Sequence, residues 1–181
     1  MTTVVEPGVS VDIEARVIQA LEDMGLPYER IPVDPAYADT AEFCKRYAFP
    51  VDRVASTIVC ASRGAQKRYS ACVVLATTRL DVNHAVRRLM GVARLSFASP
   101  DETMELTGMM IGGVTPLALP QNLAIYVDER VMTLDYVLVG GGSRSMKVKT
   151  SPEIFSRLPG VQIIASLSLD PRDSAEDGNG P

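Results

Sequence analysis

Apolar residues recur at helical spacing near the start of the chain. In the stretch "SVDIEARVIQALEDMG", Ile13, Val17 and Leu21 follow one another every four residues, which places them on one face of a helix. Ser10 precedes this pattern as an expected N-cap, and Gly25 follows it as a stop signal. The pattern predicts an amphipathic helix between these two residues.

Four later segments carry helix signals of their own. "DTAEFCKRYAF" predicts a short helix capped by Asp39 or Thr40, and "DVNHAVRRLMG" predicts one capped by Asp81. "SPDETMELTG" has a capping box, with Ser99 as the N-cap and Glu102 three residues later. "SPEIFSRLPG" has a proline at its start and predicts a closing helix.

β-Branched and apolar runs predict the strands. "VASTIVCAS" and "YSACVVLATT" are separated by the polar, glycine-containing "RGAQKR", which is the pattern of a hairpin. "ARLSF", "LAIYVDE", "YVLVGGG" and "SMKVKT" predict further strands. Because helices and strands are mixed along the chain and hairpins are prominent, we expect an α+β fold with helices packed on a sheet.

Composition limits the classes of protein that this chain can represent. The 181 residues are 46% hydrophobic and 22% charged, as in a globular protein. We expect one domain over residues 1–166 and an acidic, disordered tail over residues 167–181. The net charge of -4 argues against nonspecific DNA binding, and no apolar run is long enough to span a membrane. A cytoplasmic protein is expected.

The cysteines and the histidine give no sign of a metal site. Cys44, Cys60 and Cys72 form no C-x-x-C pair and have no metal-like spacing with His84. We therefore expect reduced thiols and neither metal nor cofactor. His84 lies outside the apolar stripe of its predicted helix, which favours a solvated or locally bonded imidazole over a catalytic one.

The stretch "TGMMIGGVTPLALP" places Gly112 and Gly113 between an apolar run and Pro116. Glycine lets backbone N–H groups turn toward a ligand, and proline restricts the chain that follows. This segment is therefore either a plain turn or a loop that binds a negatively charged group.

Several of these segments together resemble a known family. "STIVCAS", "ACVVLATT", the helix that ends in "TG", the "GGVTP" loop and "VGGG" followed by "SPE" occur in the order found in the YbaK family. That family shares its fold with the editing domain of bacterial prolyl-tRNA synthetases. The resemblance covers residues 36–160 and implies a mixed, largely antiparallel, barrel-like sheet with packed helices.

The resemblance also implies an activity. Such proteins hydrolyse the ester of a mischarged aminoacyl-tRNA, acting in trans, with a tRNA(Pro)-type substrate expected here. By this resemblance Gly112 and Gly113 would present backbone N–H groups near the scissile carbonyl, and a water molecule would attack. Val114, Thr115 and Pro116 complete the loop and are expected to contact the substrate. Donors already aimed at a developing oxyanion are worth about 3 to 4 kcal/mol each.

The chain departs from the family at one position. Many members have a lysine in the first core strand, where this chain has Ser56. Lys147 is the candidate substitute, because strand alternation turns it away from Met146 and Val148. The alternative is a solvated lysine beside Lys149. The role of Thr115 also has two alternatives: its side chain would hydrogen-bond either the substrate or its own turn.

Two further questions stay open at this stage. Six basic residues of the hairpin and the following helix either contact the phosphates of a tRNA acceptor end or keep the surface soluble: Arg63, Lys67, Arg68, Arg87, Arg88 and Arg94. The alternative to a deacylase is a binding module for aminoacyl-adenosine, a tRNA end or an aminoacyl-tRNA synthetase that lost catalysis with the lysine.

Overall fold

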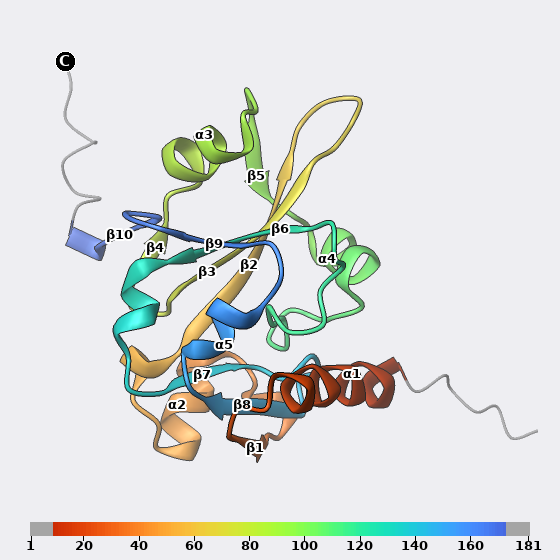
Figure 1. Ribbon diagram of the computed structural model, residues 1–181, viewed down its shortest axis with the longest axis vertical. Helices are drawn as coiled ribbons and strands as arrows, with labels where there is room; N and C mark the ends of the chain where they lie inside the picture. The colour runs from red at the N-terminus through yellow and green to blue at the C-terminus, as the bar shows by residue number, and fades with distance from the viewer. Residues whose placement is uncertain (1–8, 173–181) are drawn as a thin grey trace, which may run out of the picture.

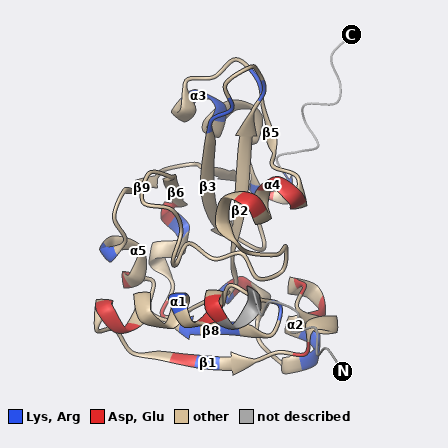
Figure 2. Cartoon of the chain, turned by 90° about the vertical axis from the view of Figure 1, so that its right-hand side faces the viewer, with Lys and Arg blue, Asp and Glu red and all other residues tan. Residues whose placement is uncertain are grey.

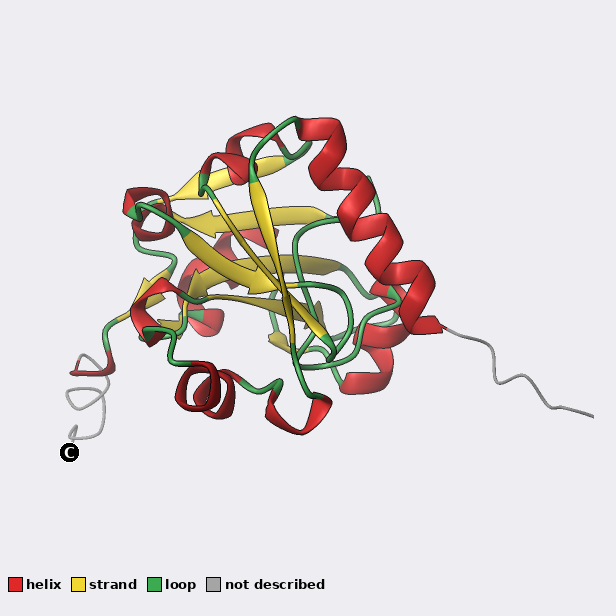
Figure 3. Ribbon diagram, turned by 90° about the horizontal axis from the view of Figure 1, so that it is seen from below, coloured by secondary structure: helices red, strands yellow, loops and turns green. Residues whose placement is uncertain are grey.

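A computed structural model describes residues 9–172 and has the predicted α+β composition. Figure 1 shows the strands gathered in the centre, with helices at the periphery, and Figure 3 shows the helices lying around the sheets. Within residues 9–172 no helix has the length and apolar character needed to cross a membrane.

The larger sheet has five strands in the order β5–β2–β3–β6–β9. β2 and β3 form the predicted antiparallel hairpin, whereas β3–β6 and β6–β9 are parallel pairs. The central strand β3 is buried from Ser70 to Val74, as expected for a strand covered on both faces. The strands of this five-stranded sheet are β2 Ala55–Ser62, β3 Tyr69–Leu75, β5 Leu95–Phe97, β6 Ala124–Asp128 and β9 Val161–Ile164.

Two smaller sheets complete the strands. An antiparallel sheet has the order β1–β8–β7, and β10 pairs with β4. The two larger sheets meet at a single bridge between Val54 and Leu138. Over the described residues the sheets therefore do not close into a barrel, although most strand pairs are antiparallel as predicted. Their members are β1 Tyr28–Pro32, β4 Arg79–Leu80, β7 Val137–Gly140, β8 Met146–Thr150 and β10 Ser168–Leu169.

The predicted helices form, with differences at their ends. Ser10 lies inside the first helix, so it is not the N-cap, because the helix already includes Val9. The capping box of Ser99 and Glu102 is present. The segment capped by Asp81 begins as a π-helical stretch before its α-helical end, and His84 bonds locally to Asp81. The helices are α1 Val9–Met24, α2 Thr40–Tyr47, η3 Val82–Val86, α3 Arg87–Met90, α4 Pro100–Thr107 and α5 Glu153–Arg157.

Short 3-10 turns link several of these elements, at Pro35–Tyr37, Val51–Arg53 and Glu129–Thr133. The core lies between the sheets and helices α1 and α5, where Val17, Leu21 and Phe155 are fully buried. These apolar side chains hold α1 against the sheets, as the four-residue repeat of the first helix predicted.

Part of the segment expected to be a disordered tail is ordered. Leu167 is fully buried, and Ser168–Leu169 pairs with β4. Ser168 also bonds the carboxylate of Asp128 through its N–H and its hydroxyl. The segment is ordered because the buried Leu167 side chain and the Asp128 carboxylate hold it in place. These two contacts are enough, although the segment contains few apolar residues. Residues 173–181 of the predicted tail lie outside the described residues.

Candidate functional site

A cavity of about 200 Å³ opens where the two larger sheets meet. Its walls come from the first turn of α2, the start of β2, the glycine loop of residues 108–116, β7 and Lys147 of β8. Ser56, Gly112, Val114 and Lys147, which are far apart in the sequence, therefore line one space. Figure 1 shows these elements converging in the lower half of the molecule.

The glycine loop is held against the turn between β7 and β8. The Gly113 carbonyl accepts a hydrogen bond of 2.8 Å from the Gly142 N–H. A Cβ on Gly113 would lie 2.5 Å from the backbone of Ser143, so only glycine permits this contact. Gly112 has φ of +94°, in the region that favours glycine. Both glycines thus have geometric reasons to be there.

The N–H groups of the loop divide into two kinds. The Gly113 N–H donates to the carbonyl of Met110 at 2.9 Å, so it is already used inside the loop, and Gly113 does not line the cavity. The N–H groups of Gly112 and Val114 donate to no acceptor within residues 9–172. Three loop residues line the cavity and have an N–H group without an acceptor in this part of the chain: Ile111, Gly112 and Val114. The N–H groups of Gly112 and Val114 lie on either side of Gly113 and are the candidate donors to a ligand.

Lys147 is a buried amine on the opposite wall. Lys147 is only 6% exposed, because its side chain lies between the glycine loop and the ring of Phe43. Nζ donates to the Gly112 carbonyl at 3.3 Å and lies 5.1 Å from the ring centroid of Phe43. A lysine ammonium has three donors, and the one hydrogen bond that Nζ makes to the described part of the chain leaves two for a ligand.

Burial lowers the pKa of Lys147 below its ordinary value, and Asp39 and Cys44 partly oppose that shift. Lys149, two residues later, is half-buried and lies over the ring of Tyr136, 4.0 Å from a Glu29 carboxylate oxygen. Of the two lysines that alternation places on one face, Lys147 is the one that lines the cavity.

Ser56 lines the cavity, and its hydroxyl makes no hydrogen bond to the described residues. Thr115 and Pro116 do not line it. Thr115 is fully buried, and its hydroxyl accepts a long 3.5 Å hydrogen bond from the Leu117 N–H, while Pro116 borders a separate hollow beside α1. The structure thus brings together four of the seven residues expected at the site.

Arg144 joins two walls of the cavity and was missed by sequence reasoning. Its guanidinium donates to the carbonyls of Ile111 and Pro35 and forms a two-pronged pair with Asp39. The hydrogen bond from Arg144 holds the pKa of Asp39 below its ordinary value. The only sequence signal was a cation in the "GGGSRS" turn, which indicates no partner.

The arrangement suits a ligand with a carbonyl or anionic oxygen. Two residues that line the small cavity have backbone N–H groups without an acceptor in residues 9–172, and the buried Lys147 ammonium lines it too. Low dielectric strengthens the contacts of such groups. Asp39, the one carboxylate in the lining, is paired with Arg144, which moderates its negative charge. The site therefore favours stabilisation of negative charge on an oxygen.

Comparisons with known proteins agree with this geometry. The family model for the aminoacyl-tRNA editing domain matches residues 34–158. The crystal structure of a hypothetical protein is similar, with a TM-score of 0.74 and 25% identity, over 85% of this chain and 99% of that one.

A second crystal structure, described as that of a candidate trans-editing enzyme for prolyl-tRNA synthetase, has a TM-score of 0.71 and 26% identity. The similarity covers 89% of this chain and 97% of that one. The family model matches more than half of this sequence, and the fold is shared along nearly the whole of these two proteins. Together these findings identify the family. The chain belongs to the aminoacyl-tRNA editing domain family.

Proposed function

We propose that this protein hydrolyses the ester of mischarged aminoacyl-tRNA in trans, with a tRNA(Pro)-type substrate. The observation that carries the proposal is that one small cavity is lined by the buried Lys147 and by Gly112 and Val114, whose N–H groups have no acceptor in residues 9–172. Membership of the editing-domain family and the similarity to a candidate trans-editing enzyme support it.

The chemistry assigns each group a task. Water attacks the ester carbonyl, the bond from the acyl carbon to the tRNA oxygen breaks, and a proton from the water passes to that leaving oxygen. Negative charge builds on the carbonyl oxygen in the transition state, where the N–H groups of Gly112 and Val114 stabilise it. Lys147 holds polar groups of the substrate by charge, in place of the family lysine that Ser56 replaces.

A second candidate function rests on that replacement. A chain with Ser56 in place of the lysine, and with the Lys147 ammonium bonded to the Gly112 carbonyl, would bind an aminoacyl-adenosine without hydrolysing it. Tight binding of an amide-linked, non-hydrolysable aminoacyl-adenosine without turnover would favour this binding module over the deacylase.

A panel of charged tRNAs tests hydrolysis directly. We expect purified protein to release amino acid from at least one of alanyl-, cysteinyl- and seryl-tRNA(Pro) faster than buffer does. Survival of every member of a full panel would refute the deacylase proposal.

Gly112→Ala then tests the loop. The new Cβ would lie 2.3 Å from the Arg144 guanidinium at an unfavourable φ, so we expect deacylation to fall by about 10²- to 10³-fold, as when one oxyanion donor is lost. Gly91→Ala is the matched control, because Gly91 also has positive φ but meets no atom within 4 Å and lies outside the cavity. Gly113→Val is less informative, since its clash with the Ser143 backbone threatens the fold itself. Equal effects of Gly112→Ala and Gly91→Ala would remove the loop from the mechanism.

A further inference from the structure

The cavity lined by Ser56, Gly112, Val114 and Lys147, which we call the acyl cavity, is too small for the whole end of a charged tRNA. Its volume is about 200 Å³, whereas sites for complete small ligands are about 300 to 1,000 Å³. If the proposed function is correct, the amino acid occupies this cavity and the terminal nucleoside must lie against an adjoining surface. The inference below rests on that function.

A second, mostly apolar hollow of about 330 Å³ adjoins the first. Thr57, Ile111 and Val114 line both spaces, and Phe97 and Ala98 form the far side of the second one. We call the surface formed by Thr57, Phe97, Ile111 and Val114 the Phe97 shelf. A ligand in the acyl cavity that continues past Thr57 would lie on this shelf.

The shelf is unusually apolar for a surface. Phe97 is 59% exposed and Ile111 is 50% exposed, and the neighbouring Met110 is 53% exposed. An exposed aromatic ring in a hollow is the feature on which a nucleic-acid base stacks, since every base has a π-face. The exposure of three large apolar side chains beside one small cavity points to a flat, apolar ligand group.

Thr57 supplies polar groups at the inner end of the shelf. Its Oγ1 is the buried side-chain oxygen without a hydrogen-bond partner in the described part of the chain. The Val59 carbonyl accepts a hydrogen bond from the Ala98 N–H at one edge of β2. Because backbone groups of strand residues two apart point the same way, the backbone N–H and C=O of Thr57 face that same edge. β5 pairs only with Cys60–Ser62, so it does not extend along this edge to Thr57. Ribose hydroxyls are suitable partners for such groups.

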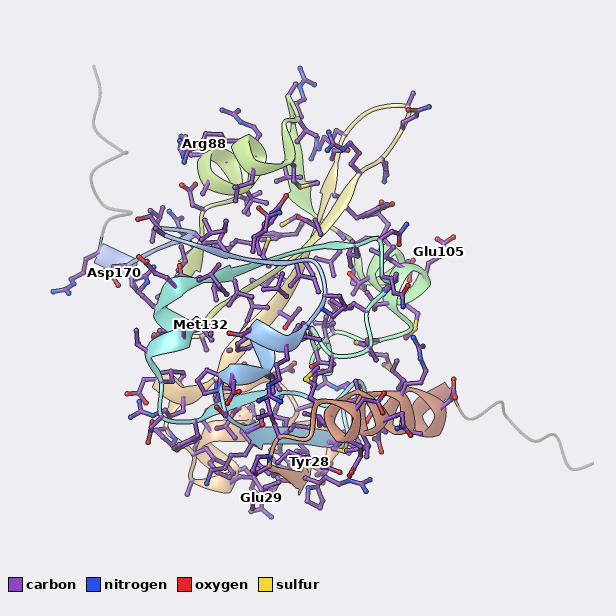
Figure 4. The ribbon with its side chains drawn as sticks, viewed as in Figure 1. Tyr28, Glu29, Arg88, Glu105, Met132 and Asp170 are labelled. Atoms are coloured by element: carbon purple, nitrogen blue, oxygen red, sulfur yellow. The ribbon has the colours of Figure 1, made fainter. Side chains whose placement is uncertain are left out.

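The direction of β2 fits an RNA end. From Thr57 the strand runs past the shelf to the hairpin, where Arg63 and Arg68 are exposed about 20 Å away at the usual rise per residue. Figure 2 shows basic residues gathered around the hairpin and α3, and Figure 4 labels Arg88 at the same end, opposite Tyr28 and Glu29. An acyl cavity, an apolar shelf and a basic end thus follow one another in the order of acyl group, nucleoside and phosphates.

We propose that the Phe97 shelf binds the terminal adenosine of the tRNA, with the base against the Phe97 ring and the ribose beside Thr57. The shelf then aligns the ester with the N–H groups of Gly112 and Val114. Phe97 is a substrate-binding residue in this proposal and takes no part in the bond-breaking step.

Binding measurements test the shelf without requiring hydrolysis. The probes are alanyl-adenosine with an amide in place of the ester, and alaninamide, which lacks the nucleoside. Phe97→Ala should weaken binding of the adenosine probe about 5- to 150-fold, the range for loss of one base stack, and should leave alaninamide binding unchanged. Phe97→Tyr should retain adenosine binding, because the ring remains.

Ile163→Ala is the control, since Ile163 is an exposed apolar residue on β9 outside both hollows. Failure of the wild-type protein to bind the adenosine probe, equal effects of Phe97→Ala and Ile163→Ala, or equal losses for both probes would overturn the shelf. Loss of adenosine binding in Phe97→Ala without turnover of any charged tRNA would support the shelf and refute the hydrolysis.

Discussion

Two buried charges in this protein have opposite surroundings. Asp128 is fully buried, and its carboxylate accepts hydrogen bonds from Arg130 and from the N–H and hydroxyl of Ser168. Lys147 is almost as buried, but its ammonium has one acceptor among residues 9–172, the Gly112 carbonyl, and lines a cavity. One charge is satisfied by the fold, and the other has hydrogen-bonding capacity left over.

The pKa shifts express the same contrast. Burial raises the pKa of Asp128, but the hydrogen bonds from Arg130 and Ser168 outweigh it and leave the pKa below the ordinary value, so the charged form is favoured. For Lys147, burial lowers the pKa and the surrounding acids do not compensate, so the charged form is disfavoured. A buried charge that its own fold leaves incompletely paired is a better indicator of a ligand site than burial alone.

The largest expected effect in this comparison is on stability. Asp128→Ala should lower the free energy of unfolding by about 3 to 5 kcal/mol, because the buried Ser168 N–H and hydroxyl lose their acceptor and Arg130 loses its buried partner, keeping only Ser168 and Asp170. Urea denaturation measures this loss, and deacylation well below the melting temperature should be little changed. Asp135→Ala is the control: Asp135 pairs with Arg53 at an exposed site, so about 1 kcal/mol or less is expected.

The same variant has a pH signature. Because the folded pKa of Asp128 lies below the unfolded value of about 3.9, its stabilisation is fully present above that value and is lost as pH falls through the folded pKa. The stability gap between wild type and Asp128→Ala should therefore narrow in acid. A gap that is constant down to the acid limit would contradict the role of the charged form.

Lys147→Met should show the reverse behaviour. We expect deacylation to fall about 10- to 150-fold, the equivalent of one charge-assisted hydrogen bond, with stability unchanged or increased because an incompletely paired buried charge is removed. Lys149→Met is the matched control on the same strand and should be nearly silent. Ser56→Ala should cost less than about 10-fold, since a neutral hydrogen bond is weaker. Full activity in Lys147→Met would show that the glycine loop acts without this cation.

The smallest effect concerns the C-terminal segment that completes the Asp128 network. Deletion from Asp170 onward removes an exposed pair with Arg130 and should cost about 1 kcal/mol or less. Deletion from Leu167 onward removes a fully buried side chain and the two Ser168 bonds, and should cost several times more. Equal melting temperatures for the two truncations would show that Leu167 and Ser168 contribute nothing.

Local signals account for the elements that were predicted correctly. The hairpin of β2 and β3, the capping box of Ser99 and Glu102, and the buried face of α1 each depend on residues a few positions apart. Four strands were not predicted, because their pairing partners lie far away in the sequence: β1 pairs with β8, β4 with β10 and β9 with β6. The predicted boundary at residue 167 was wrong for the same reason, since a distant carboxylate orders Ser168.

The candidate site shows the same division. The amino-acid sequence by itself determined the helices and the strands with strong local patterns, that Gly112 and Gly113 make a special turn, and that Lys147 alternates with Met146 and Val148. These properties depend on neighbouring residues. Only the tertiary structure decided that Lys147 is buried at the cavity, that the Gly113 N–H is used internally, and that Arg144 joins Asp39 to the loop. Those outcomes depend on which distant backbone and side-chain groups come within hydrogen-bonding distance, and strand pairing across the whole chain sets that proximity.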